Sequence, residues 1–411
     1  MAVILFLVDY EEGHIFPTFG LATFLAERGH SIHYVSVVDN EKYIISRGFI
    51  FHSICENEYP KGSRENFKLD QIQNRVSSKL TYCHALDPHF GNILKKVKPD
   101  LLIVNTFLSL EALLIYYRFK IQPIIFTPYL LSDIDPQHEG YNNMRYLPMP
   151  VIASLLYHAP IWNRTSGLSN EIINPKHIIT RARLKKFLRP LNNFVELVAC
   201  PKELDYNPHF NKSNRIHLGP SIRTGSNRRS FSKGKPNNKI IFASLGSQTA
   251  RIFQNSFKFY QCLIKVMRDP GLCDTQLVIS TGEGFDLESF KPLPSNVQVY
   301  NWVDQIDILQ LSSLAIIHGG LGSVKECIYF GVPMIVYPGM YDQPRNAMLV
   351  KHHGLGVQDD FASVSEDQLK ANIMNVMTND VIRRNVKKMK AIFREKEESN
   401  EGYRFIEKYL R

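Results

Sequence analysis

Residues 302–343 decide the fold of this chain and carry most of its chemical signal. The stretch contains three groups in a fixed order: Trp302-Val303-Asp304-Gln305, then His318-Gly319-Gly320-Leu321-Gly322-Ser323-Val324-Lys325-Glu326, then Tyr341-Asp342-Gln343. The apolar run Leu314-Ala315-Ile316-Ile317 stands immediately before the second group and predicts a buried strand. The second group therefore follows a strand at the point where a ligand can approach the main chain.

The second group predicts a glycine-rich turn that opens a helix. Glycines after a strand permit positive φ and close approach of the main chain to a ligand. Ser323 and Glu326 have the spacing of a capping box, which predicts a helix that begins at about Ser323. A helix N-terminus presents unpaired N–H groups and partial positive charge, which suit a diphosphate. Taken by itself, the group is equally compatible with an ordinary strand, turn and capped helix.

The order and spacing of all three groups resemble the donor signature of the UDP-sugar glycosyltransferases of the GT-B superfamily. That signature runs W-x-x-Q, then H-x-G-x-x-S-x-x-E, then D/E-Q. The chain matches it at Trp302, Gln305, His318, Gly320, Ser323, Glu326, Asp342 and Gln343. Bacterial family 1 members, including macrolide and carotenoid glycosyltransferases, are the most similar. The resemblance implies an α/β fold of the GT-B type, in which two Rossmann-like domains face each other across a cleft.

The resemblance also implies a role for each donor residue. Trp302 stacks on the uracil ring, and the main chain of Val303 contacts the base edge. Gln305 and Glu326 bind the ribose, since a carboxylate accepts from two adjacent hydroxyls. The diphosphate is held by His318, Ser323 and the main chain of Gly322, with Gly320 in the same turn, and by Ser247 of a second turn, Ser244-Leu245-Gly246-Ser247. Asp342 and Gln343 bind the sugar hydroxyls.

A second motif, Gly13-His14-Ile15-Phe16-Pro17, follows the first predicted strand. It matches the G-H-x-x-P sequence of the same family, whose histidine is the general base. A neutral imidazole can take a hydroxyl proton near neutral pH, so this role suits His14. The acceptor oxygen then attacks the anomeric carbon from the face opposite the nucleotide. The resemblance therefore implies inversion of configuration and departure of UDP.

Asn105 departs from the family pattern, because most members carry Asp at this position to pair with the histidine. An Asp fixes the tautomer and stabilises the imidazolium, whereas a neutral Asn can only orient the ring through its carbonyl oxygen. The equivalent change in the serine-protease triad costs about 10⁴ in rate. Three explanations stay open: an acidic acceptor such as a phenol, a substitute carboxylate, or a chain that binds nucleotide sugar with poor catalysis. The candidate carboxylates are Asp9, Glu11, Glu12, Glu111, Asp133 and Glu139.

Composition is that of a globular chain. The 411 residues, 44% hydrophobic and 21% charged, are enough to bury two cores. No apolar run reaches the roughly 18 residues of a membrane-spanning helix, and the apolar start at 1–8 predicts a strand and no secretory signal. Six cysteines without CxxC spacing indicate reduced thiols, no metal site and a cytoplasmic location. No cofactor is expected beside the UDP-sugar co-substrate.

The net charge of +10 raises the question of anionic partners. Part of the excess lies in one segment, at Arg223, Arg228, Arg229, Lys233, Lys235 and Lys239. Because Gly, Ser, Asn and Pro accompany these residues, the segment predicts a solvated linker. No nucleic-acid-binding signature accompanies it, so nucleic acid is not an expected partner. Peripheral contact with an anionic membrane surface stays open.

The linker divides the chain into two halves. The predicted organisation is an acceptor-binding Rossmann-like domain at 1–218, a basic linker at 219–238, a nucleotide-sugar-binding Rossmann-like domain at 239–385, and a C-terminal helix at 386–411 that packs back on the first domain. The predicted strands are Val3–Val8, His33–Val37, Leu101–Val104, Ile124–Phe126, Lys239–Ala243, Gln276–Ile279, Val297–Tyr300, Leu314–Ile317 and Met334–Tyr337. Their alternation with helical segments predicts parallel βα units.

The acceptor site is the part that the sequence defines least. Aromatic and apolar candidates to line it are Phe107, Tyr129, Tyr141 and Met144, and packing in the first domain is an equally good explanation for each of them. The sequence thus predicts an inverting transferase that moves a hexose, with glucose favoured, from a UDP-sugar to a hydrophobic small molecule such as a natural-product phenol or alcohol. An auxiliary protein that binds nucleotide sugar with little or no catalysis is the alternative. A sugar-nucleotide epimerase is a third candidate, which Trp302 and the G-H-x-x-P motif argue against.

Overall fold

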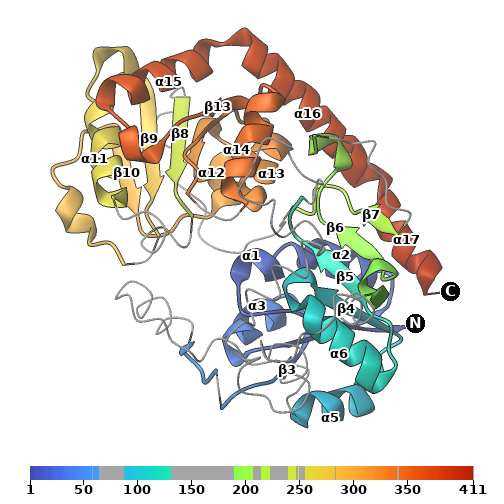
Figure 1. Ribbon diagram of the computed structural model, residues 1–411. Helices are drawn as coiled ribbons and strands as arrows, with labels where there is room; N and C mark the ends of the chain where they lie inside the picture. The colour runs from blue at the N-terminus through green and yellow to red at the C-terminus, as the bar shows by residue number, and fades with distance from the viewer. Residues whose placement is uncertain are drawn as a thin grey trace, which may run out of the picture. The chain divides into compact units, whose positions relative to one another are not determined.

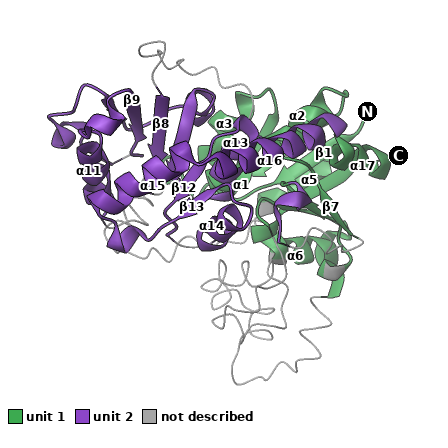
Figure 2. Cartoon of the chain, turned by 90° about the horizontal axis from the view of Figure 1, so that it is seen from above, with its two compact units in different colours: residues 1–200, 209–221, 400–411 green, residues 201–208, 222–399 purple. Residues whose placement is uncertain are grey.

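The chain folds into two compact units, shown in Figures 1 and 2. The computed structural model describes residues 1–57, 59–63, 88–130, 189–206, 214–222, 239–246, 249, 255–282, 284–339 and 342–410. Unit 1 comprises residues 1–200, 209–221 and 400–411, and unit 2 comprises residues 201–208 and 222–399. The predicted linker lies outside the described residues from position 223 to 238.

Unit 1 is built on a parallel sheet of seven described strands in the order β3-β2-β1-β4-β5-β6-β7. The strands are β1 (Val3–Leu7), β2 (Ser31–Ser36), β3 (Ile50–Ser53), β4 (Leu101–Asn105), β5 (Ile124–Thr127), β6 (Glu196–Val198) and β7 (Arg215–His217). The described helices are α1 (Glu12–Ile15), α2 (Thr18–Ala26), α3 (Glu41–Ile45), α5 (Pro88–Val97), α6 (Ser109–Phe119) and α17 (Glu401–Tyr409), with 3-10 turns η1 (Val38–Asn40), η3 (Thr106–Leu108) and η5 (Arg189–Asn192).

Helices cover both faces of this sheet, which explains why its central strands are continuously apolar. Leu5 and Leu7 of β1 point to one face and pack with buried residues of α5 and α6. Ile4 and Phe6 point to the other face and pack with buried residues of α2 and α17. Because side chains alternate along a strand, a strand buried on both faces needs apolar residues at every position. The runs that predicted β1 and β4 have this composition.

Helix α17 belongs to unit 1 because it packs on α2 and β7. A methyl group at Gly402 would lie 2.2 Å from the main-chain oxygen of His217, so only glycine permits this approach. The hydroxyls of Tyr403 and Ser221 lie 3.1 Å apart. Arg28 and Glu407 form a further contact of 3.0 Å between the guanidinium and the carboxylate. These contacts fix the end of the chain against the first sheet.

Unit 2 repeats the plan with a parallel sheet of six described strands in the order β10-β9-β8-β11-β12-β13. The strands are β8 (Lys239–Ser244), β9 (Thr275–Ser280), β10 (Val297–Tyr300), β11 (Ser312–Ile317), β12 (Met334–Val336) and β13 (Gly356–Gln358). The described helices are α11 (Ser256–Val266), α12 (Gln305–Leu309), α13 (Leu321–Phe330), α14 (Gln343–His352), α15 (Glu366–Thr378) and α16 (Asp380–Ser399), with 3-10 turns η6 (Lys202–Leu204), η7 (Pro270–Leu272), η8 (Leu287–Phe290) and η9 (Phe361–Ser363).

The end of unit 2 falls later in the chain than the predicted limit of 385. Helix α16 continues to Ser399 and stays with unit 2, because its Lys390 ammonium donates to the main-chain oxygen of Phe330 at 3.0 Å. The Tyr329 hydroxyl also donates to Glu397 at 2.6 Å. The chain changes units at Asn400, whose φ of 49° ends the helix. Residues 400–411, and not 386–399, therefore belong to unit 1.

Two further observations concern membrane-spanning helices and disulfides. Across the described residues, the helices are too short or too polar to cross a bilayer. Within the described residues, Cys55, Cys200, Cys262, Cys273 and Cys327 form no disulfide, and Cys83 lies outside those residues.

Candidate active site

In each unit, one predicted histidine motif lies at the point in the sheet where the strand order reverses. In unit 1 this point is between β1 and β4, and His14 and Asn105 lie at the carboxyl ends of these strands. In unit 2 it is between β8 and β11, which Gly246 and His318 follow. Open parallel sheets bind ligands beyond the carboxyl ends of the strands at such a point. The topology therefore places both motifs where a site is expected.

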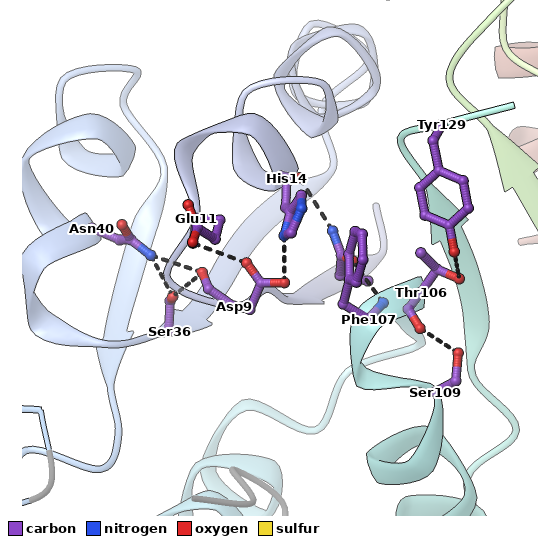
Figure 3. Close-up of polar contacts among 10 residues, drawn as sticks. Asp9, Glu11, His14, Ser36, Asn40, Thr106, Phe107, Ser109 and Tyr129 are labelled. Atoms are coloured by element: carbon purple, nitrogen blue, oxygen red, sulfur yellow. Dashed lines mark hydrogen bonds and ion pairs between the residues drawn. The ribbon is translucent and has the colours of Figure 1, made fainter. Parts of the chain in front are cut away.

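His14 in unit 1 contacts a buried carboxylate (Figure 3). Its Nδ1 atom lies 2.8 Å from Oδ2 of Asp9, whose side chain is fully buried. The second carboxylate oxygen, Oδ1, accepts the main-chain N–H of Glu11 at 3.0 Å. The main-chain oxygen of Asp9 accepts from Ser36 Oγ at 3.0 Å and from Asn40 Nδ2 at 2.9 Å. Residues at the end of β2 and in η1 thus fix the position of Asp9.

The imidazole of His14 also stacks on an aromatic ring. The ring centroids of His14 and Phe107 are 3.9 Å apart with an interplanar angle of 15°. Tyr129 lies beyond Phe107, with 5.3 Å between the ring centroids, and its hydroxyl is 3.4 Å from that of Thr106. The side chain of His14 remains 22% exposed, so the ring has a rigid support and one open side. Of the four predicted acceptor residues, Phe107 and Tyr129 therefore lie beside the histidine.

Asn105 contacts the main chain of His14 and not its ring. Its Nδ2 donates to the main-chain oxygen of His14 at 3.2 Å, and its Oδ1 accepts the N–H of Phe107 at 3.0 Å. The carbonyl oxygen that was expected to orient the ring therefore caps η3 instead. Among the other candidate carboxylates, Glu12 accepts from the Tyr43 hydroxyl at 2.6 Å. Glu111 is buried on α6, and Asp133 and Glu139 lie outside the described residues.

His318 in unit 2 stands between two glycines. A methyl carbon added to Gly246 would lie 2.7 Å from ring atom Cε1, and one added to Gly320 would lie 2.7 Å from Nε2. Desolvation by burial lowers the pKa of His318 from 6.5 to about 4, so the ring is neutral at physiological pH. No group in the described part of the chain hydrogen-bonds either ring nitrogen. The imidazole therefore keeps one N–H and one lone pair for a ligand.

The ribose-binding candidates come together through one amide. Gln305 Nε2 donates to Ser323 Oγ at 3.1 Å and to Glu326 Oε2 at 2.5 Å. The predicted capping box is wrong: α13 begins at Leu321, Gly320 is its N-cap, and no side chain caps it. Ser323 is thus in the first turn of α13, and its hydroxyl accepts from Gln305 on the preceding helix α12.

The sugar-binding candidates lie at the start of α14. Asp342 precedes this helix, and its Oδ2 accepts from Asn346 Nδ2 at 2.8 Å. The same Asn346 amide donates to the main-chain oxygen of Gly319 at 2.9 Å. Gln343 is buried and accepts the N–H of Gly339 at 2.9 Å. Sequence reasoning missed Asn346, which connects Asp342 to the glycine turn, although its i, i+4 spacing from Asp342 was a usable signal.

The remaining predicted residues are placed as follows. Trp302 is 49% exposed and stands with Val303 between β10 and α12. Gly322 lies in the first turn of α13, and a methyl group there would meet no atom within 4 Å. Ser247, Tyr141 and Met144 lie outside the described residues.

Comparisons with a family model and with individual proteins both match this chain to glycosyltransferases. Residues 284–398 match the family described as UDP-glucoronosyl and UDP-glucosyl transferase. NDP-glycosyltransferase YjiC of Bacillus subtilis is 26% identical over 92% of this chain and 89% of its own length. Demethyllactenocin mycarosyltransferase of Streptomyces fradiae is 22% identical over 96% of this chain and 83% of its own.

Solved structures match over nearly the whole chain. The glycotransferase of kitacinnamycin has a TM-score of 0.76 at 21% identity, with 100% of this chain and 99% of that chain covered. Spinosyn rhamnosyltransferase SpnG, complexed with thymidine diphosphate, has a TM-score of 0.64 at 14% identity, with 96% of each chain covered. At these identities, the structural likeness is evidence for the fold.

Proposed function

We propose that this chain, which has the fold of the GT-B glycosyltransferases and matches their family model over residues 284–398, transfers a hexose from a UDP-sugar to a hydrophobic small molecule with inversion of configuration. The observation that carries the proposal is the contact of Gln305 with both Ser323 and Glu326. This contact joins Gln305, at the start of the donor signature, to Ser323 and Glu326 in its middle. One oxygen of the Glu326 carboxylate accepts from this amide, and carboxylate oxygens are the acceptors that ribose hydroxyls require.

The turn after β11 suits the diphosphate of the donor. Helix α13 begins there without a side-chain cap, so its first N–H groups are available to an anion. The neutral imidazole of His318 adds an N–H donor without a counter-charge. We expect these groups to stabilise the leaving diphosphate without a metal ion, so chelation by EDTA should leave the rate unchanged.

Asp342 and Gln343 are assigned as the residues that select the donor sugar, and glucose is the favoured sugar. Both side chains are held by neighbours, Asp342 by Asn346 and Gln343 by the main chain of Gly339. A carboxylate fixed in this way can accept from sugar hydroxyls with little loss of side-chain entropy. One relative is named for mycarose and one structural neighbour holds thymidine diphosphate, so the donor panel must include thymidine nucleotides and deoxysugars.

His14 is assigned as the general base that takes the proton of the acceptor hydroxyl. The ring is partly exposed, and Phe107 supports one of its faces. Apolar and aromatic surroundings favour a hydrophobic acceptor, and two of the similar proteins are named for demethyllactenocin and kitacinnamycin. We therefore assign the acceptor to the natural-product phenols and alcohols.

The decisive experiment measures UDP release from UDP-glucose with and without a mixed set of phenols and alcohols, and determines product masses. Acceptor-dependent release with a hexose mass gain is the expected result. Parallel reactions with TDP-glucose and with a deoxysugar donor rank the donors by kcat/KM. Nucleotide binding without turnover for every donor and acceptor would instead favour the auxiliary protein. That alternative arose from Asn105, and the buried carboxylate beside His14 weakens its basis.

A further inference from the structure

The structure points to Asp9 as the positioning residue of the catalytic histidine, an inference that rests on the proposed function. The family pattern places this carboxylate at the end of β4, where this chain has Asn105. Here the carboxylate comes instead from the segment between β1 and α1, the short helix that carries His14. The inference therefore moves one partner of the catalytic pair to a different strand end.

The geometry of the contact defines the tautomer of His14. The distance of 2.8 Å between Asp9 Oδ2 and His14 Nδ1 lies in the range of charge-assisted hydrogen bonds. A carboxylate accepts and does not donate, so Nδ1 carries the hydrogen and Nε2 carries the lone pair. The ring therefore presents its basic nitrogen away from Asp9.

The surroundings of Asp9 keep the carboxylate in place. It is fully buried, and burial of a charge is costly unless hydrogen bonds compensate for it. Oδ1 accepts the N–H of Glu11, and Oδ2 faces the imidazole. The hydrogen bonds from Ser36 and Asn40 fix the main chain of the same residue. An acid held in this way can orient the ring without reorganisation during the reaction.

Asn105 has a different task that occupies its whole amide. One end donates to the main chain of His14, and the other accepts from the main chain of Phe107. The residue therefore connects α1 to η3, which carries the ring stacked on the imidazole. Asp9 and Asn105 therefore have separate roles: Asp9 orients the imidazole of His14, and Asn105 holds the main chain of His14.

The chemical step uses these positions in a balanced way. Nε2 takes the proton of the acceptor hydroxyl while the acceptor oxygen forms its bond to the anomeric carbon. The bond between that carbon and the diphosphate oxygen breaks, and its electron pair leaves with UDP. Asp9 stabilises the imidazolium that results and does not itself take the proton.

The variant Asp9→Asn tests the inference because it reverses the tautomer preference. With its oxygen still accepting from Glu11 N–H, the amide presents NH₂ to Nδ1, which must then accept and leave the hydrogen on Nε2. We expect kcat with an aliphatic alcohol to fall by about 10² to 10⁴-fold, with the donor KM unchanged. A nitrophenol that is already ionised at the assay pH needs no base and should lose much less. The matched control is Glu12→Gln, which removes a carboxylate three residues from Asp9, at the start of α1, and keeps an acceptor for Tyr43.

The two acceptors separate positioning from folding. A structural defect would reduce turnover of both acceptors by the same factor, and this result would overturn the inference. Full activity of Asp9→Asn with the alcohol would also overturn it.

A second measurement reads the ring directly and needs no turnover. Nitrogen-15 chemical shifts of His14, assigned with His14→Ala, should show hydrogen on Nδ1 in the parent protein at a pH where the ring is neutral. In Asp9→Asn the hydrogen should move to Nε2. Hydrogen on Nε2 in the parent would overturn the inference. Absence of transfer by a parent protein with the expected tautomer would instead contradict the proposed function.

Discussion

The two histidines of the predicted site have opposite surroundings. His14 in unit 1 faces the buried carboxylate of Asp9 at 2.8 Å and is 22% exposed. His318 in unit 2 stands between Gly246 and Gly320, and burial lowers its pKa to about 4. Both residues follow a central strand at the point where the order of their own sheet reverses. The two histidines therefore share a position in the fold and differ in their neighbouring groups.

The difference shows how one side chain can serve two kinds of chemistry. A carboxylate partner fixes a tautomer and stabilises a positive ring, which suits repeated proton transfer. Close packing of the half-buried ring between two glycines, with no charged partner among the described residues, penalises the positive ring, which suits a donor that remains neutral beside a diphosphate. Under the proposed function, His14 changes its charge during each turnover and His318 does not.

The largest expected effect tests the proton-transfer half of this comparison. His14→Ala removes the only group proposed to take the acceptor proton, so kcat with an aliphatic alcohol should fall by about 10³ to 10⁴-fold. UDP affinity, measured by calorimetry, should hardly change. His318→Ala, measured in parallel, should weaken UDP binding instead. Strong residual transfer by His14→Ala would remove the residue as the base and break the comparison.

The second prediction concerns the neutral state of His318. Its folded pKa of about 4 lies below the ordinary value of 6.5, so between these values the unfolded chain binds a proton that the folded chain does not. Stability should therefore fall as pH falls from 6.5 towards 4, by at most about 3 kcal/mol from this half-buried group. Urea unfolding of the ligand-free protein across this range measures the loss. His318→Gln should lack this part of the pH dependence, and an unchanged slope would contradict the neutral enclosure.

The third prediction concerns the glycine enclosure. Gly320 has φ of −58°, which alanine can adopt, but the added methyl would lie 2.7 Å from His318 Nε2. The ring must move, so the donor KM should rise about tenfold, the equivalent of about 1.4 kcal/mol. In a His318→Ala background, the same Gly320→Ala change should add little. Additive effects would show that the glycine acts independently of the imidazole.

The central strands were predictable from sequence because parallel strands buried on both faces are continuous apolar runs. Strand β10 has the predicted limits, and β1 differs from its prediction by one residue. Strands β3, β6, β7 and β13 were missed, and β6 and β7 are short and contain the polar residues Glu196 and Arg215. In the structure these two side chains form a buried ion pair of 3.0 Å between adjacent strands. Composition alone cannot reveal such a pairing, because it forms only when the sheet does.

The candidate site also has a part that the sequence predicted and a part that it did not. The sequence order of the donor signature was enough to predict the group that contains Gln305, Ser323 and Glu326, which the structure brings together. It did not single out Asp9, which was one of several acids that could replace the missing partner of His14. A motif gives the position of a residue relative to others in the pattern. A residue from outside the pattern that replaces a missing partner can be identified only from interatomic distances in the structure.

The smallest expected effect is the most specific to the carboxylate position. Asn105→Asp restores the residue of the family pattern, and a rise in activity on alcohols would show that His14 lacks a charged partner. Because Asp9 already contacts the ring, we expect no gain. The new oxygen would face the main-chain oxygen of His14, which now accepts from Asn105 at 3.2 Å, so one hydrogen bond is lost. The cost of about 1 kcal/mol should appear mainly in the urea midpoint, with kcat within about threefold of the parent. Activity well above the parent would mean that the Asp9 contact does not supply the charge that proton transfer needs, and the contrast between the two histidines would then rest on His318 alone.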